Sequence, residues 1–469
     1  MGSMHRDRRI LTGLGRLAGS DAPVVRLGAA VLACLFLLSA CLINGYPLLF
    51  PDSGNYMALA IVAEELPYRT LVYATLLTAL GAAWTLWLTV VFQSLAIVWL
   101  LDQAVALLVP KAHPGWLVGI ALALTLLTGL PWYVGQIMPD VFAGALILAM
   151  ALLVMFPHRL PPWRRLILGV LVALGTAIHS SHLPVALALL AAGAIALRLA
   201  DSPMRRMAAP VLAVALGVAT IPAVHYAETG RAYFNKGGDI FFFARLVEDG
   251  IVGRYLNDYC PLPDTVLCAF RDQLPTTHNG YLWDDIQAFE MAGGWEQSGP
   301  ESRRIILATF RHYPLMHLKT AFDSFVRQLV LVRTGDYLRS TFLHNTTTLE
   351  IMLPWEAGAY HHARQQLGEL QLFDELNWIH VPLQLASFFL LPVVAIALWR
   401  RGDRPVALFC ALLMAGMVAN ALACGTLSNP QDRYQSRVVW IAVLAVGLVA
   451  APPLQQAWRR RRDISVRGR

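Results

Sequence analysis

Residues 24–50 read VVRLGAAVLACLFLLSACLINGYPLLF, and residues 51–56 continue as PDSGNY. The apolar run is longer than the core of a secretory signal peptide, and no A-x-A-like cleavage site follows it, so it predicts a retained membrane helix. The first charged side chain after this helix is Asp52, in a turn-forming context. A carboxylate at that place is a candidate for chemistry at the membrane surface.

The composition of the whole chain is that of a multi-pass membrane protein. Of its 469 residues, 57% are hydrophobic and only 14% are charged. Such a chain has too little polar surface to cover a soluble globule. The net charge of +7 would suit a nucleic-acid-binding protein, but the arginines cluster at the ends of apolar runs. This distribution is typical of membrane topology and excludes nucleic acid as the expected partner.

Apolar segments long enough to span a bilayer predict about ten crossings. They lie at about 24–50, 82–108, 115–130, 140–156, 165–179, 183–198, 209–227, 380–399, 405–424 and 437–455. Alternate connections carry the basic residues, which predicts that both termini are cytoplasmic. These basic residues are Arg6, Arg8, Arg9, Lys111, Arg159, Arg164, Arg165, Arg198, Arg205, Arg206, Arg400, Arg401, Arg404 and Arg459 to Arg462.

The expected fold is an all-α bundle with three parts. Residues 1–227 form an N-terminal transmembrane module with catalytic outer loops, and residues 228–379 form a mostly helical outer, periplasmic segment. Residues 380–469 form the C-terminal transmembrane helices and a basic cytoplasmic tail. Two stretches, from Leu66 to Gly81 and from Leu315 to Val332, predict helices that lie in the outer membrane interface.

The outer connections hold the unusual polar residues. Asp140 begins an otherwise apolar helix, either as a helix N-terminal carboxylate or as a second active-site acid. His179 and His182 interrupt a long apolar span, which predicts either a hairpin turn or a broken helix that lines a pocket. Phosphate binding through imidazole, hydroxyl and backbone N–H groups fits this break better than zinc, which lacks a third ligand nearby in sequence.

Two further outer sites stand out. Arg433 and Arg437 precede the last crossing and run against the positive-inside tendency, so a lipid-linked phosphate is a suitable partner for a guanidinium there.

Cys260 and Cys268 lie close together on the oxidising side and predict a small disulfide. The remaining cysteines, Cys34, Cys41, Cys410 and Cys424, are interpreted as packing residues. Asn345 begins an Asn-Thr-Thr glycosylation pattern.

The order and sidedness of these features together resemble the GT-C superfamily of membrane glycosyltransferases, which use polyprenyl-phosphate sugars. The matching residues are Asp52, Pro67 with Tyr68, Asp140, His179 to His182, and Arg433 with Tyr434. A large outer segment completes the match, which covers roughly residues 24–200 and 425–455. Family members often carry a lysine in the polar break, where this chain has two histidines.

The resemblance implies an inverting transfer of a hexose or pentose from a polyprenyl-phosphate donor to a lipid, glycan or protein acceptor. Asp52 would be the general base, and Asp140 would orient the acceptor or Asp52. The implied donor-phosphate ligands are Arg433, His182, His179 and Arg69, and the implied pocket residues are Tyr56, Tyr68 and Tyr434. Arginines neutralise a monophosphate leaving group without a metal, so no cofactor is required, although a divalent metal is compatible with the pattern.

Two other classes of function compete with this hypothesis. A lipid or small-molecule transporter or flippase would also have a broken span and intramembrane acids, and it would place the carboxylates near the bilayer midplane. A structural partner subunit would place Asp52 and Asp140 apart, with no cavity between them. The sugar, the acceptor and the length of the prenyl chain are not encoded in any pattern of the sequence.

Overall fold

The computed structural model describes residues 23–62, 66, 68–109, 112–284, 287–339 and 342–467, with side chains for all of these except Val62 and residues 451–467. The basic residues Arg6, Arg8, Arg9 and Lys111, and Pro67 of the family match, lie outside the described residues. The regular structure of the described residues is helical, and their single extended pairing is an isolated bridge between Leu48 and Gln136. The predicted all-α class is confirmed.

Six helical segments in the described chain are long and apolar enough to cross a membrane, judged by length and composition. They are α6 (Trp87–Leu108), α11 (His182–Leu199), η2 with α12 (Met204–Thr229), α21 (Leu372–Arg400), α22 (Arg404–Leu427) and the first part of α23 (Asp432–Arg467). Shorter apolar helices are α2 (Pro23–Leu37), α7 (Gly115–Leu127) and α9 (Val141–Met155). Helix α10 (Pro162–Ala177) follows α9 in the chain. A multi-pass membrane protein follows from these six, while ten crossings stay a prediction.

Helix α9 is the centre of the bundle. All of its 15 residues are buried, and it packs against α10, α11, α22 and α23. A helix that is apolar on every side has no face that requires water, so other helices can surround it completely. The residue that precedes α9 is Asp140. A buried carboxylate is thereby placed at the end of a helix that is enclosed along its whole length.

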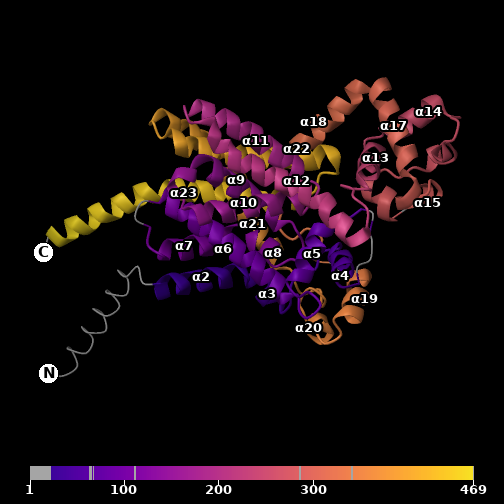
Figure 1. Ribbon diagram of the computed structural model, residues 1–469. Coiled ribbons are helices and arrows are strands. Elements are labelled where there is room, and N and C mark those ends of the chain that lie inside the picture. Colours follow the sequence, from indigo (N-terminus) through magenta and orange to yellow (C-terminus); the bar gives the residue numbers. More distant parts are fainter. Residues whose placement is uncertain are drawn as a thin grey trace.

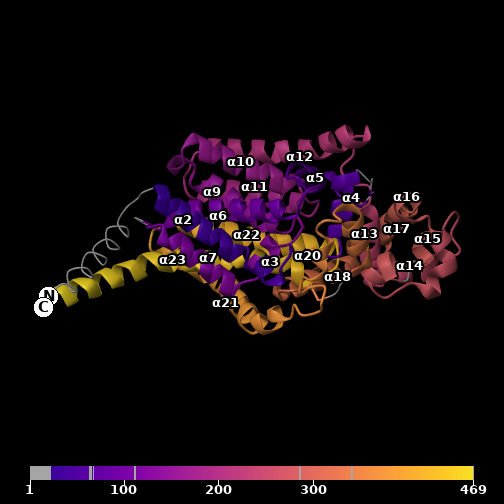
Figure 2. The ribbon, with the colours of Figure 1, turned by 90° about the horizontal axis from the view of Figure 1, so that it is seen from below.

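The first part of the outer segment has a hydrophobic core of its own, built around Phe243, Leu256, Tyr281 and Phe289. Its elements are α13 (Gly238–Glu248), α14 (Ile251–Tyr259), η3 (Val266–Gln273), η4 (Gly280–Asp284), α15 (Gln287–Met291), α16 (Gly294–Gln297) and α17 (Gly299–His312). Figures 1 and 2 show this group at one end of the molecule, opposite to the C-terminal part of α23.

Helix α18 (Pro314–Val330) returns from this group to the bundle and packs against α22. Its outward face carries exposed apolar side chains, among them Leu315, Leu318 and Phe322. This amphipathic character fits the interfacial helix predicted there.

The remaining short elements, apart from η1 at the other end of α9, gather near the first outer loop. They are α3 (Ser39–Asn44), α4 (Ser53–Val62), α5 (Leu71–Ala79), α8 (Leu130–Val134), η1 (Pro157–Arg159), α19 (Leu343–Met352) and α20 (Ala357–His361). Helix α19 packs on α4, and α5 packs between α4 and α12. The first predicted interfacial helix is thus α5, but more than half of its residues are buried against these neighbours.

Candidate functional site

A cavity of about 820 Å³ lies where the ends of the bundle helices meet the outer segment. It collects residues from outer connections that are far apart in sequence. Seven of the nine predicted catalytic, phosphate-binding and pocket residues line it: Asp52, Tyr56, Tyr68, Arg69, His179, Arg433 and Tyr434. The other two, Asp140 and His182, lie behind its wall.

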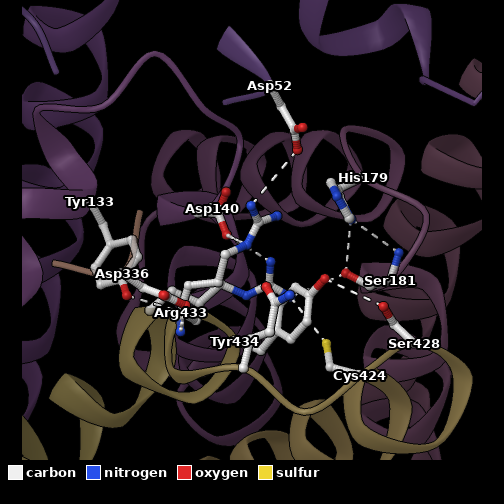
Figure 3. Close-up of polar contacts among 12 residues, drawn as sticks. Asp52, Tyr133, Asp140, His179, Ser181, Asp336, Cys424, Ser428, Arg433 and Tyr434 are labelled. Carbon is white, nitrogen blue, oxygen red and sulfur yellow. Dashed lines mark hydrogen bonds and ion pairs between the residues drawn. The ribbon is translucent and has the colours of Figure 1, made fainter. Parts of the chain in front are cut away.

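The charged centre of the cavity is formed by two arginines around Asp52. Arg69 makes an ion pair with one oxygen of Asp52, and the Nη1 atom of Arg433 lies 3.7 Å from the other. The Nε atom of Arg433 lies 3.7 Å from Asp140 Oδ1, so this guanidinium stands between two acids (Figure 3). At 3.7 Å these are ion pairs without a direct hydrogen bond.

Each of these arginines has an N–H group without a hydrogen-bond partner among the described residues. The Nε atoms of Arg69 and Arg433 are buried and have no hydrogen-bond partner among the described residues. An unsatisfied buried donor is costly, and a negatively charged oxygen is the partner that would relieve the cost best. Both side chains also line the cavity, so two positive charges face the same space.

Asp140 is held behind the wall by Arg437, which the sequence singled out only as a basic residue on an outer loop. Arg437 is fully buried and donates to Asp140 Oδ1 at 2.9 Å, to Ser181 Oγ at 3.1 Å and to Asn420 Oδ1 at 3.2 Å. The Asp140 side chain makes no helix-capping hydrogen bond, although it precedes α9. Its carboxylate instead compensates the charges of Arg433 and Arg437, as a buried cation requires.

The polar break between α10 and α11 contributes His179 to the cavity but not His182. His179 Nδ1 lies 2.8 Å from Ser181 Oγ, and that hydroxyl also contacts Arg437. His182 is completely buried, and its Nδ1 lies 2.8 Å from the backbone oxygen of Gly175. Direct phosphate contact through His182 therefore does not fit this geometry, because the ring faces back toward α10.

The loop that carries Asp52 is tied to the second outer loop. Leu48 exchanges backbone hydrogen bonds of 2.8 and 3.0 Å with Gly135 and Ile137, and Ser53 Oγ donates to the Ile137 oxygen at 3.0 Å. Backbone pairing of this kind fixes the loop more firmly than side-chain contacts do, since two successive groups are held at once.

Helix α19 adds a second tie to the same loop, which the sequence did not predict. Asn345 is 1% exposed, and its Oδ1 accepts the Gly54 N–H at 2.7 Å while its Nδ2 donates to Phe50 O at 2.8 Å. Gly54 is required by this approach, because a Cβ there would lie 2.7 Å from Asn345 Oδ1. The amide of the glycosylation pattern is thus committed to positioning Asp52.

Aromatic rings flank both arginines. The Arg69 guanidinium lies 5.2 Å from the ring centre of Tyr68 and 5.8 Å from that of Tyr56. The Arg433 guanidinium lies 4.2 Å from the Phe50 ring and 5.0 Å from the Tyr434 ring. Rings in these positions stabilise the cations by cation–π attraction and keep the guanidinium planes in place without consuming their N–H donors.

The part of the cavity lining that comes from the outer segment carries fewer charged side chains than the centre around Asp52. Burial lowers the pKa of His278, which lines the cavity, so this imidazole is neutral at pH 7. Burial raises the pKa of Asp336, whose carboxylate accepts the backbone N–H of Arg433 at 3.3 Å. Within the described residues, no three His, Cys, Asp or Glu side chains converge as a metal site.

The predicted cysteines lie as follows. Cys260 and Cys268 are joined by a disulfide in the outer segment. Cys424, interpreted as a packing residue, is buried but lines the cavity, and its Sγ lies 3.4 Å from Arg437 Nη2. Cys34, Cys41 and Cys410 are free thiols of the bundle.

Comparison with known proteins found no similar family model, curated protein or solved structure. Any function must therefore be argued from the chemistry of the cavity itself.

Proposed function

We propose that this protein is an inverting membrane glycosyltransferase of the GT-C type. It would transfer a sugar from a polyprenyl-phosphate donor to an acceptor at the periplasmic face of the bacterial inner membrane, with ten crossings and cytoplasmic termini. The observation that carries the proposal is that Arg69 and Arg433 line one cavity on either side of Asp52, so two guanidinium groups face the same space.

The donor phosphate would take the place between the two guanidinium groups. Its two non-bridging oxygens, which share one negative charge in this phosphodiester, would accept from Arg69 and Arg433 in place of the Asp52 carboxylate. Asp52 would then be released to take the proton of the acceptor hydroxyl. The hydroxyl oxygen forms its new bond to the anomeric carbon from the face opposite the phosphate, and the carbon–oxygen bond to the phosphate breaks.

The polyprenyl phosphate leaves with its negative charge held by the arginines. Fixed electrostatic donors of this type contribute roughly 3–4 kcal/mol each to transition-state stabilisation. Asp140 and Arg437 act as positioning residues, because they hold Arg433 from behind without lining the cavity. His179 remains a candidate phosphate ligand, and the tyrosines Tyr56, Tyr68 and Tyr434 shape the pocket.

Binding of a lipid phosphate tests the first half of the proposal. Full-length protein in nanodiscs is titrated with decaprenyl monophosphate, and Arg433→Gln is expected to weaken binding at least tenfold. Arg254→Gln, an exposed arginine of the outer segment with a nearby acid, is the matched control and is expected to bind like the unmodified protein. Equal affinity in all three proteins would refute the phosphate site.

An assay of sugar transfer tests the second half of the proposal. Polyprenyl-phosphate hexoses and pentoses are offered with a membrane extract as the acceptor source, and Asp52→Asn is expected to retain lipid binding but lose transfer more than a hundredfold. A well-folded Asp52→Asn protein with unchanged transfer rates would show that Asp52 is not the base. If the intact lipid crosses the bilayer without losing its sugar, the chain is a transporter instead.

A further inference from the structure

An aromatic cluster leads from the charged centre of the cavity to the outer segment. We call Tyr68, Phe241, Trp283 and Trp295 the aromatic wall. The ring centres of Tyr68 and Trp283 are 5.6 Å apart, those of Tyr68 and Trp295 4.5 Å, and those of Phe241 and Trp295 5.2 Å. Since Tyr68 also lies under the Arg69 guanidinium, the wall begins directly beside the proposed phosphate site.

The packing of this cluster is close and specific. Gly237, at the start of α13, lies against Tyr68, and a Cβ at this position would come within 3.1 Å of the Tyr68 Cα and Cβ. Trp295 is held behind Tyr68 and Trp283. The wall is thereby a preformed surface that joins the membrane module to the outer segment.

Trp283 presents its ring to the cavity. It lines the cavity and is 43% exposed, although it belongs to the π-helix η4, whose neighbours Tyr281 and Leu282 are buried. An indole ring that remains half-exposed in a cavity offers a flat apolar face to a ligand.

Hydrogen-bonding groups stand next to this apolar face. Asn235, His278 and Asp284 line the same cavity. A ligand that covers Trp283 must therefore have an apolar face and polar edges at once. A hydrocarbon chain would bury these polar groups without partners, at a cost for each. A sugar ring meets both demands, because its C–H groups pack on the indole while its hydroxyls bond to the surrounding side chains.

A second cleft, of about 650 Å³, adjoins the cavity. Asn279 and Asn429 line both spaces. The second cleft carries acids and bases together, such as Asp249 with Arg245 and Asp323 with Arg327, beside threonine hydroxyls. Arg245 is 3% exposed, and its Nε has no hydrogen-bond partner among the described residues. A lining with both signs of charge and many neutral donors suits an uncharged polyhydroxylated ligand better than an anion or a cation.

We infer that the outer segment binds a saccharide. One ring packs on Trp283, and the chain continues past Asn279 into the second cleft. That this saccharide is the acceptor of the transfer rests on the proposed function, which then takes a glycan rather than a protein as its acceptor class. Saccharide binding itself requires only the two spaces and their lining.

The inference is tested by sugar binding to the full-length protein in nanodiscs. The probes are the methyl glycosides of glucose, galactose, mannose, N-acetylglucosamine and arabinose, and the trisaccharides maltotriose and mannotriose, each up to 50 mM, followed by saturation-transfer NMR. At least one probe is expected to bind. Trp283→Ala is expected to weaken its binding at least tenfold, and Trp283→Phe, which keeps a flat ring, is expected to retain most of it. Trp378→Ala, a tryptophan of α21 that is 85% exposed, is the matched control without effect.

The outcome separates this inference from the proposed function. No binding by any probe, or equal binding by Trp283→Ala and the unmodified protein, overturns the saccharide site. Decaprenyl monophosphate binding that is lost in Arg433→Gln and kept in Trp283→Ala supports two separate subsites. Sugar binding that depends on Trp283, together with no phosphate binding, leaves the saccharide site in place and removes the proposed transferase.

Discussion

Replacing Arg437 by Met should destabilise the protein more than any exposed charge change. Arg437 is fully buried and lies 2.9 Å from Asp140, while Arg433 lies 3.7 Å from the same carboxylate oxygen. At an effective dielectric constant of about 20, unit charges at these separations attract by roughly 6 and 4–5 kcal/mol, respectively. Both arginines therefore attract Asp140 strongly, and Arg437 is the one that also donates a hydrogen bond to it.

The net loss is smaller than the attraction, because the buried ions have already lost their hydration. Removal of one partner from a buried pair typically costs about 3–5 kcal/mol, and we expect that loss for Arg437→Met. The double variant Asp140→Asn with Arg437→Met removes both charges. It should lose at least about 2 kcal/mol less than the sum of the two single variants, because the two groups interact directly.

Unfolding of the purified protein by SDS titration in mixed micelles, followed by tryptophan fluorescence, measures these differences. Lys319→Met is the matched control, since Lys319 pairs with Asp323 in the open, with 76% and 56% of the two side chains exposed. Exposed pairs contribute at most about 1 kcal/mol. An Arg437→Met protein as stable as the Lys319→Met control, or single-variant losses that simply add, would refute the buried network.

Four further outcomes follow from the same structure. Asn345→Ala should lower transfer about a hundredfold with little change in lipid binding, because a loop displaced by about 1 Å misplaces Asp52; unchanged turnover would contradict the positioning role. Gly54→Ala should have a similar effect, and combining it with Asn345→Ala should add little further loss, as turnover of the double variant can verify. The pKa of His278 is lowered in the folded state, so its contribution to stability is present above pH 6.5 and is lost as the pH falls below that value. Unfolding measured between pH 7.5 and 5.5 should therefore be less pH-dependent in His278→Gln, and an identical slope would exclude His278 as its source. Changing Cys260 and Cys268 to Ser should lower the free energy of unfolding by roughly 2–3 kcal/mol, the loop-closure term for eight residues. The affinity for decaprenyl monophosphate should stay the same, and a lower affinity would place the disulfide in the lipid site.

Much of the cavity could be anticipated from local patterns. Hydropathy marked the apolar spans, and the distribution of basic residues predicted which of the connections between them are outer. Asp52, Arg69, His179 and Arg433 were found in this way, because a charged side chain beside an apolar run is costly unless something specific compensates it. Proximity in sequence was also enough to predict the disulfide in the outer segment, which the structure contains.

Contacts between distant segments escaped the same reasoning. Asp140 and Arg437 are 297 positions apart, and Asn345 holds a loop 291 positions away. Nothing in the local pattern around Asn345 distinguishes a buried positioning amide from a glycosylation acceptor. His182 satisfies the same pattern as His179, but the turn between α10 and α11 directs only His179 into the cavity.

The sequence by itself therefore determined which segments are apolar and which are polar, since hydropathy is a property of neighbouring residues. It established the all-α class, the apolar helices and the polar connections in which candidate residues occur. Only the tertiary structure decided which of these residues share a cavity, which acid compensates which arginine, and that Trp283 faces the same space. Those outcomes depend on distances between segments, and the packing around α9 sets these distances.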